Sequence, residues 1–339
     1  MKTNRMGGSG LRVSEVCLGT MTFGNQADQD TSFAIMDVAD AHGVTFFDTA
    51  DVYPLGGDLS SVGRTEEIVG AWLQARGARE RIVLATKCRG TMGPNSNDAG
   101  LSRKHIISAC DASLHRLQTD YIDLYQVHWP DADVEIEETL RALDDLVRDG
   151  KVRYVGCSNY PAHLLSDALW TSKMHGLARF ECDQPRYNIL FRMIEDEILP
   201  LCRQHGVGVI AYNPLAGGML TGRYRDRAAS SEVEQGSRFA LTGASALYRQ
   251  RYWNDAVFET VKSLGDFVSG RGKSLTHVAL AWVLVQEGVT SAIVGASKPA
   301  QLVDSLAGVD LMLDDEEREA CDGAWHSLPR DPNRATALR

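Results

Sequence analysis

An acid, a phenol, a lysine and a histidine stand at or near the ends of three apolar segments of the chain. Asp48 and Tyr53 belong to FFDTADVYP at 46–54, Lys87 ends IVLATK, and His128 follows IDLYQV. A phenol can donate a proton to an oxygen, an adjacent ammonium favours the resulting phenolate, and a carboxylate keeps that ammonium charged. An imidazole can add a hydrogen bond to the same oxygen. The four residue types therefore indicate proton transfer to an oxygen, if the fold brings them together.

Each of the four residues also has a purely structural interpretation. Asp48 and Pro54 could mark a turn and Tyr53 could pack, since such residues are common where strands end. A lysine at a strand end is more often solvated, and a lone histidine more often satisfies its own hydrogen bonds. Four such residues on neighbouring strands of one rim are harder to explain in this way, and they favour a site.

The elements that must position these residues follow a regular alternation. Short β-branched segments alternate with amphipathic ones, a pattern typical of parallel βα units. The predicted strands are 16–20, 44–49, 82–87, 122–127, 152–157, 180–184, 207–212 and 291–294. The predicted helices are about 31–42, 65–75, 102–117, 135–150, 161–173, 194–205, 276–286 and 299–307, with Ser102 as an N-cap and Gly150 as a C-cap residue. Residues 216–255 show no strand periodicity and are expected to form a functional loop or lid.

Eight strands with intervening helices predict an α/β fold, a closed (β/α)8 TIM barrel, in which chemistry sits at the carboxyl ends of the strands. We expect one barrel domain over 1–339, with an N-terminal β-hairpin and extra C-terminal helices and loops. The competing open sheet usually carries G-x-G-x-x-G after its first strand, but here GGSG at 7–10 precedes that strand. The segment GDLSSVGRT at 57–65 does not fit a P-loop.

Composition narrows the class of partner. The 339 residues are 44% hydrophobic and carry a net charge of -10, which argues against a nucleic-acid or anionic membrane surface. The N-terminus lacks an apolar signal segment, no apolar run is long enough to span a bilayer, and the seven cysteines form no C-x-x-C. We therefore expect a cytoplasmic protein with reduced thiols and a small-molecule partner. No metal site is expected, because the nine histidines show no ligand spacing.

Seven segments in succession resemble the motifs of the aldo-keto reductases: GVTFFDTADVY, IVLATK, SLHRLQTDYIDLYQVHWPD, VRYVGCSNY, QPRYN, YNPLAGGMLTGRY and AIVGASKPAQL. The catalytic tetrad of that family falls on Asp48, Tyr53, Lys87 and His128. YNPLAGGMLTGRY and SRFALTGASALYRQRYW are most similar to the aflatoxin-aldehyde reductase branch. The resemblance implies an oxidoreductase that reduces an aldehyde or ketone to an alcohol, with hydride from NADPH and a proton from Tyr53.

The resemblance also implies which residues contact NADPH or NADP+. The implied cofactor residues are Ser158, Asn159 and Gln184 on the carboxamide, Tyr212 stacked on the nicotinamide, Gly19, Thr20 and Met21 on the ribose side, Leu215, Gly217 and Gly218 near the pyrophosphate, and Ser297, Lys298 and Gln301 on the adenosine phosphate, with Asp48, Asn213 and Gly295 completing the set. The positive charge of Lys298 favours a 2′-phosphate.

Two other classes of function stay open at this point. The resembling family includes potassium-channel β subunits, so a cofactor-sensing regulatory protein is one alternative. A barrel hydrolase or isomerase is another, although it should not need the nicotinamide-binding residues. The sequence defines neither the physiological carbonyl compound nor the oligomeric state, and it is compatible with a homo-oligomer.

Overall fold

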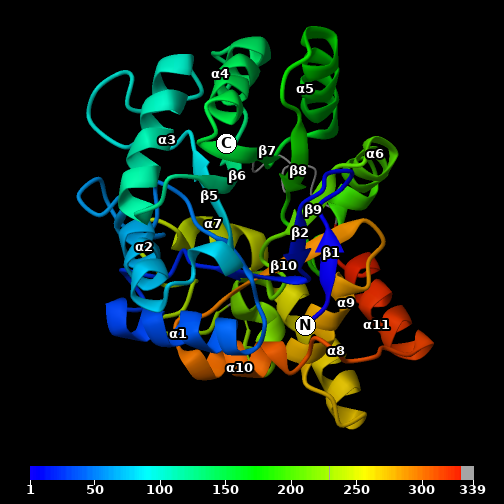
Figure 1. Cartoon of the computed structure of the whole chain (residues 1–339). Helices are drawn as coiled ribbons and strands as arrows, with labels where there is room; N and C mark the ends of the chain where they lie inside the picture. Colours follow the sequence, from blue (N-terminus) through cyan, green and yellow to red (C-terminus); the bar gives the residue numbers. More distant parts are fainter. Residues whose placement is uncertain (229, 330–339) are drawn as a thin grey trace.

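The computed structural model describes residues 1–228 and 230–329. Eight parallel strands close into a barrel in the order β10-β3-β4-β5-β6-β7-β8-β9, and helices surround it (Figure 1). The strands are β3 (Val16–Gly19), β4 (Phe46–Asp48), β5 (Val83–Cys88), β6 (Ile122–Val127), β7 (Val152–Ser158), β8 (Phe180–Gln184), β9 (Gly208–Ala211) and β10 (Val289–Gly295). The predicted (β/α)8 barrel is confirmed, and each strand ends close to its predicted bounds.

Eight helices lie where the sequence predicts them: α1 (Gln29–Ala41), α2 (Arg64–Arg76), α3 (Arg103–Leu117), α4 (Ile136–Arg148), α5 (Ala162–His175), α6 (Ile198–His205), α9 (Leu275–Leu284) and α10 (Pro299–Leu306). Ser102 caps α3 as predicted, because its side chain accepts a hydrogen bond from the backbone N–H of His105. The prediction of one continuous helix over 194–205 is wrong. A separate 3-10 turn, Met193–Glu195, precedes α6.

Three further helices were not located from the sequence: α7 (Ser245–Tyr252), α8 (Asp255–Gly270) and α11 (Asp315–His326). Strict alternation allows one helix between successive strands, whereas α7, α8 and α9 all lie between β9 and β10. The segment 216–255, predicted as a loop, contains no strand in its described residues 216–228 and 230–255, but it includes the 3-10 turn Ala216–Thr221 as well as α7. The remaining short 3-10 turn is Arg79–Arg81.

An antiparallel hairpin of β1 (Thr3–Arg5) and β2 (Arg12–Ser14) covers the amino end of the barrel, as predicted. The backbone N–H of Gly8 donates to the carbonyl oxygen of Gly206 at 2.7 Å, which ties the hairpin turn to the end of α6. Met6 and Val13 are fully buried against the barrel interior, where they meet Cys17, Phe46, Ala85, Leu124, Cys182 and Ile210. These apolar side chains fill the amino end of the barrel.

A polar layer lies above this apolar layer because side chains alternate along each strand. On β5, Ala85 faces the barrel interior and Leu84 faces the helices, so Lys87 returns to the interior two residues after Ala85. The same step of two separates Phe46 from Asp48, Leu124 from Gln126 and Cys182 from Gln184. The fold therefore gathers an ammonium, a carboxylate and two amides at the carboxyl end of the barrel.

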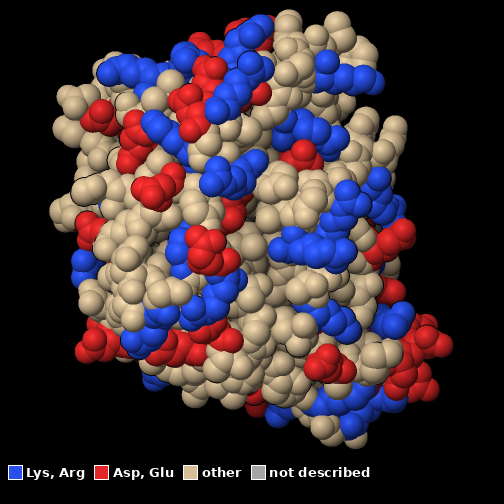
Figure 2. All heavy atoms as spheres, in the orientation of Figure 1, with Lys and Arg blue, Asp and Glu red and all other residues tan. Residues whose placement is uncertain are grey.

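The outer surface shown in Figure 2 carries basic and acidic side chains interspersed, with no large area of a single sign on that face. Within the described ranges, no helix is both long enough and apolar enough to cross a bilayer. All seven cysteines are buried and free, in agreement with the expected reduced thiols.

Candidate active site

Lys87 and Asp48 form an ion pair at the centre of the polar layer, with exposed side-chain fractions of 0% and 3%. The ammonium of Lys87 donates to Oδ1 of Asp48 and, at 2.9 Å, to the backbone oxygen of Thr49. Burial lowers the pKa of Lys87, but the charge of Asp48 and the phenol of Tyr53 raise it, and the net shift is upward. Lys87 therefore stays charged in a dry environment, as predicted for this pair.

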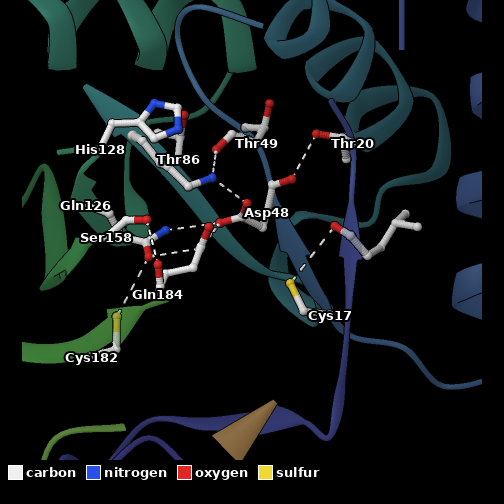
Figure 3. Close-up of polar contacts among 12 residues, drawn as sticks. Cys17, Thr20, Asp48, Thr49, Thr86, Gln126, His128, Ser158, Cys182 and Gln184 are labelled. Atoms are coloured by element: carbon white, nitrogen blue, oxygen red, sulfur yellow. Dashed lines mark hydrogen bonds and ion pairs between the residues drawn. The ribbon is translucent and has the colours of Figure 1, made fainter. Parts of the chain in front are cut away.

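Gln126 is a member of this cluster that the sequence prediction missed. Its Nε2 donates to Oδ2 of Asp48 at 3.0 Å, and Nε2 of Gln184 donates to the same oxygen at 2.9 Å (Figure 3). The two amides satisfy the carboxylate oxygen that Lys87 leaves open, so the orientation of Asp48 is fixed. A signal existed in the sequence: Gln126 is a polar residue inside the apolar strand IDLYQV, two positions from His128.

The ring of Tyr53 lies next to this pair. Nζ of Lys87 is 5.2 Å from the centre of the ring, and Tyr53 itself is only half-buried. Burial raises the pKa of Tyr53, whereas the charge of Lys87 lowers it, and the net shift is upward. The predicted effect of Lys87 is thus present, but the expectation that Tyr53 becomes a stronger acid overall is wrong, because burial raises its pKa by more than Lys87 lowers it.

His128 completes the predicted tetrad. Its ring meets the edge of Tyr53 with centres 5.8 Å apart and stacks on Trp129 at 3.8 Å. Burial, followed by the charges of Lys87 and Arg89, holds the pKa of His128 well below its ordinary value. The imidazole is therefore neutral at physiological pH, so it can donate one hydrogen bond without adding a charge beside Lys87.

The residues predicted to bind the carboxamide and nicotinamide lie together at the ends of β7, β8 and β9. The hydroxyl of Tyr212 donates to Oδ1 of Asn159 at 2.9 Å, which fixes the Tyr212 ring. Nδ2 of Asn159 donates to the backbone oxygen of His128 at 3.1 Å and to Oγ of Ser158 at 2.9 Å. Ser158 in turn donates to the backbone oxygen of Gln184 at 2.7 Å. These contacts join the predicted cofactor group to the tetrad.

The predicted ribose residues follow β3, next to Asp48. Thr20 is fully buried, and its hydroxyl donates to the backbone oxygen of Asp48 at 2.9 Å. Met21 is half-buried, and its carbonyl oxygen accepts from the N–H of Leu55 at 2.9 Å. Gly19 pairs with Asp48 across β3 and β4, and a Cβ there would lie 2.6 Å from the side chain of Ile293. A larger residue at this position would therefore have to displace the Ile293 side chain.

The turn after β9 presents backbone where the pyrophosphate is predicted. Oδ1 of Asn213 accepts from the N–H of Gly217 at 2.6 Å, and half-buried Leu215 lies within the same turn. Gly217 and Gly218 have φ values of 69° and 98°, a region that favours glycine. A Cβ on Gly218 would meet nothing within 4 Å, so this backbone borders open space.

The predicted adenosine residues lie apart from the tetrad, at the turn between β10 and α10. Oε1 of Gln301 accepts from the N–H of Ser297 at 2.9 Å and from its hydroxyl at 3.1 Å. Gly295 and Lys298 are exposed, and Lys298 is the N-cap residue of α10. In the described part of the chain, no group of three or more histidine, cysteine, aspartate or glutamate side chains could hold a metal ion.

A buried acid outside the tetrad gives the fold a pH dependence. Asp183 is fully buried behind Gln184, and burial raises its pKa from 3.8 to about 7, although the thiol of Cys157 and two backbone N–H groups lower it. Folded Asp183 therefore keeps a proton at pH values where the unfolded chain has lost it. Its contribution to stability is fully present below about pH 4 and is lost as the pH rises toward 7.

We expect Asp183→Asn to reduce the fall in unfolding free energy between pH 5 and pH 8. With about 1.4 kcal/mol for each pH unit between pH 5 and the folded pKa of about 7, the effect of Asp183 over this range is about 3 kcal/mol. Urea unfolding of both proteins across this range measures it, and the difference between the two slopes isolates Asp183 from other groups. Parallel curves for the two proteins would show that Asp183 does not titrate there.

Comparison with known proteins places this geometry in a family. The family described as "Aldo/keto reductase family" matches residues 15–326. The chain is 38% identical to a probable voltage-gated potassium channel subunit beta from Arabidopsis thaliana, over 92% of each chain, and 38% identical to the uncharacterized oxidoreductase YrpG from Bacillus subtilis, over 93% of each. It is 34% identical to norsolorinic acid reductase B from Dothistroma septosporum, over 93% of this chain and 79% of that one. A closed barrel with this rim and a match over nearly its whole length show that the chain belongs to the aldo/keto reductase family.

Proposed function

We propose that this oxidoreductase uses NADPH to reduce an aldehyde or ketone to an alcohol, with Tyr53 as the proton donor. The observation that carries the proposal is the buried ion pair of Lys87 and Asp48 beside the Tyr53 ring, in a member of the aldo/keto reductase family. A hydrolase or isomerase would have no use for the residue group that joins Tyr212 to His128.

Tyr53, Lys87 and His128 have different roles in proton delivery. The raised pKa of Tyr53 keeps the phenol protonated at neutral pH, so the donor is always loaded. As the proton leaves, the nearby ammonium of Lys87 stabilises the phenolate, and Asp48 holds that ammonium in place. Neutral His128, packed against Tyr53, donates a hydrogen bond to the oxygen on which negative charge develops.

The residues present suit a nicotinamide dinucleotide, which would supply the hydride. The ring of Tyr212 offers a flat surface held by Asn159, the backbone of Gly218 borders open space, and the ammonium of Lys298 is exposed. In this order, the groups would stack on the nicotinamide, let backbone approach the pyrophosphate, and place positive charge near the adenosine phosphate. A dinucleotide would thus extend from the tetrad toward α10.

Lys298→Ala is expected to weaken NADPH binding by roughly 3- to 10-fold and NADH binding much less, because only NADPH carries the 2′-phosphate. Quenching of tryptophan fluorescence measures both dissociation constants, and Lys104→Ala on α3 is a control for the loss of one lysine. Equal weakening of both cofactors would count against the phosphate contact.

The decisive test of the proposal is cofactor titration followed by a screen of aldehydes, quinones and keto sugars. We expect NADPH to bind and at least one carbonyl compound to be turned over many times. The absence of NADPH binding to the folded protein would refute the proposal.

A second candidate is a cofactor-sensing regulatory protein, which the name of the Arabidopsis relative favours. Such a protein would keep the tetrad and the cofactor but turn over slowly. Steady-state rates with the best carbonyl compound distinguish the two functions, because rapid multiple turnover excludes a purely regulatory role.

A further inference from the structure

Arg89 stands beside the tetrad without an evident structural reason. Cys88, the last residue of β5, pairs with Val127 of β6, so Arg89 and His128 occupy the next position on these neighbouring strands. The N–H of His128 donates to the carbonyl oxygen of Cys88 at 3.0 Å, which keeps the two strand ends together. Arg89 lies close enough that its charge helps to lower the pKa of His128.

The backbone holds Arg89 in an uncommon conformation. Its φ of 116° lies in a region that side-chain-bearing residues rarely adopt, and such strain is concentrated at functional sites. The next residue, Gly90, fits closely against the Tyr53 turn, because a Cβ there would lie 1.9 Å from Cγ1 of Val52. The carbonyl oxygen of Arg89 also accepts from the N–H of Gly100 at 2.9 Å. The position of Arg89 between Val52 and His128 is thus fixed from both sides.

One buried nitrogen of the Arg89 guanidinium has no partner among the described residues. Its Nε is buried without a hydrogen-bond acceptor, and it forms no ion pair with any residue in 1–228 or 230–329. In contrast, half-buried Arg79 and Arg116 each meet a carboxylate oxygen at 2.7 Å. A buried donor without an acceptor is unfavourable, and a cation attracts negative charge, so an anionic oxygen from outside the chain would satisfy the Nε of Arg89.

The barrel topology separates this anion from those of the cofactor. In the closed order of strands, β5 lies opposite β9 and β6 lies opposite β10 (Figure 1). The proposed pyrophosphate and adenosine residues follow β9 and β10, whereas Arg89 follows β5. The phosphates of a dinucleotide extended toward α10 would therefore lie on the other side of the barrel mouth.

We infer that Arg89 selects carbonyl substrates that carry an anionic oxygen group, a carboxylate or a phosphate. This inference rests on the proposed reductase function and adds the substrate class. A guanidinium can hold either anion by two parallel hydrogen bonds. Arg89 lies beside both His128 and the Tyr53 turn, so the anion and the carbonyl oxygen would be bound at separate points and the substrate oriented.

The test compares Arg89→Met with the unchanged protein on 4-formylbenzoate, 4-formylphenyl phosphate and neutral 4-nitrobenzaldehyde. We expect kcat/KM for one or both anionic aldehydes, divided by that for the neutral aldehyde, to fall by roughly 10- to 100-fold, mainly through KM. Arg89→Lys should restore part of this ratio. Arg203→Met removes the same charge from α6, next to the hairpin, and should leave the ratio unchanged.

An equal loss on all three aldehydes, or no loss, would overturn the inference. A larger effect on the carboxylate or on the phosphate identifies which anion is bound. If the unchanged protein reduces none of the three, the anion site is tested by binding instead. Calorimetric titration in the presence of NADP+ then measures the affinity for 4-(hydroxymethyl)benzoate and 4-(hydroxymethyl)phenyl phosphate. Weaker binding of either to Arg89→Met would support the anion site even though the reductase proposal had failed for these compounds, and equal binding of both would refute it.

Discussion

Tyr53→Phe is expected to lower kcat for carbonyl reduction by roughly 10²- to 10⁴-fold, the range typical for loss of a positioned proton donor. The substitution removes only the hydroxyl and keeps the ring that packs near Lys87 and His128. The ion pair of Lys87 and Asp48 stays intact, because the Lys87 ammonium keeps its hydrogen bonds to Asp48 and to the backbone oxygen of Thr49. The loss should therefore appear in turnover and not in folding.

Single-turnover measurement of NADPH oxidation at saturating cofactor tests this expectation. Fluorescence titration should show NADPH affinity close to that of the unchanged protein, which separates chemistry from binding. Tyr121→Phe is a matched control, since Tyr121 precedes β6 at the other end of the barrel. Unchanged turnover in Tyr53→Phe would reject the proton-donor role.

Lys87→Met is expected to have the second large effect, and on two quantities at once. It leaves the carboxylate of Asp48 buried without its cation, which typically costs about 3–5 kcal/mol of unfolding free energy. It also removes the charge that stabilises the phenolate of Tyr53, so kcat should fall strongly. Urea unfolding and steady-state kinetics on the same preparation measure both.

The double variant Asp48→Asn with Lys87→Met separates these two effects. It removes both charges, so most of the lost stability should return, while kcat should stay low because the ammonium is still absent. Recovery of turnover in the double variant would mean that Lys87 acts only by neutralising Asp48. Full stability of Lys87→Met alone would show that the buried carboxylate is not charged.

The barrel, and the meeting of Asp48 and Lys87 at its rim, could be predicted because both rest on strands. IVLATK and IDLYQV are short apolar segments, and a parallel barrel places the side chains at their carboxyl ends on one rim. Gln126 was missed because it lies inside a strand, where a polar residue looks like an exposed position until the barrel interior is considered. The alternation of side chains, which puts Gln126 on the face of Leu124, was the available signal.

The balance of forces on Tyr53 could not be obtained from the sequence. The neighbouring lysine was identifiable, but the depth of burial depends on the turn after β4 and on the loops packed around it, and burial raises the pKa by more than Lys87 lowers it. Arg89 shows the same limit. Its residue type and position were visible, but its missing counter-ion and its backbone conformation are properties of the folded chain.

The amino-terminal hairpin has a consequence for the order of events in the barrel. Because Met6 and Val13 plug the far end, any molecule that enters must depart by the route it used on arrival. A molecule bound deep in the barrel mouth cannot leave past one bound above it. The most deeply bound molecule therefore binds first and is released last. The hairpin imposes this order together with the apolar strand side chains beneath it, although none of its residues belongs to the candidate site.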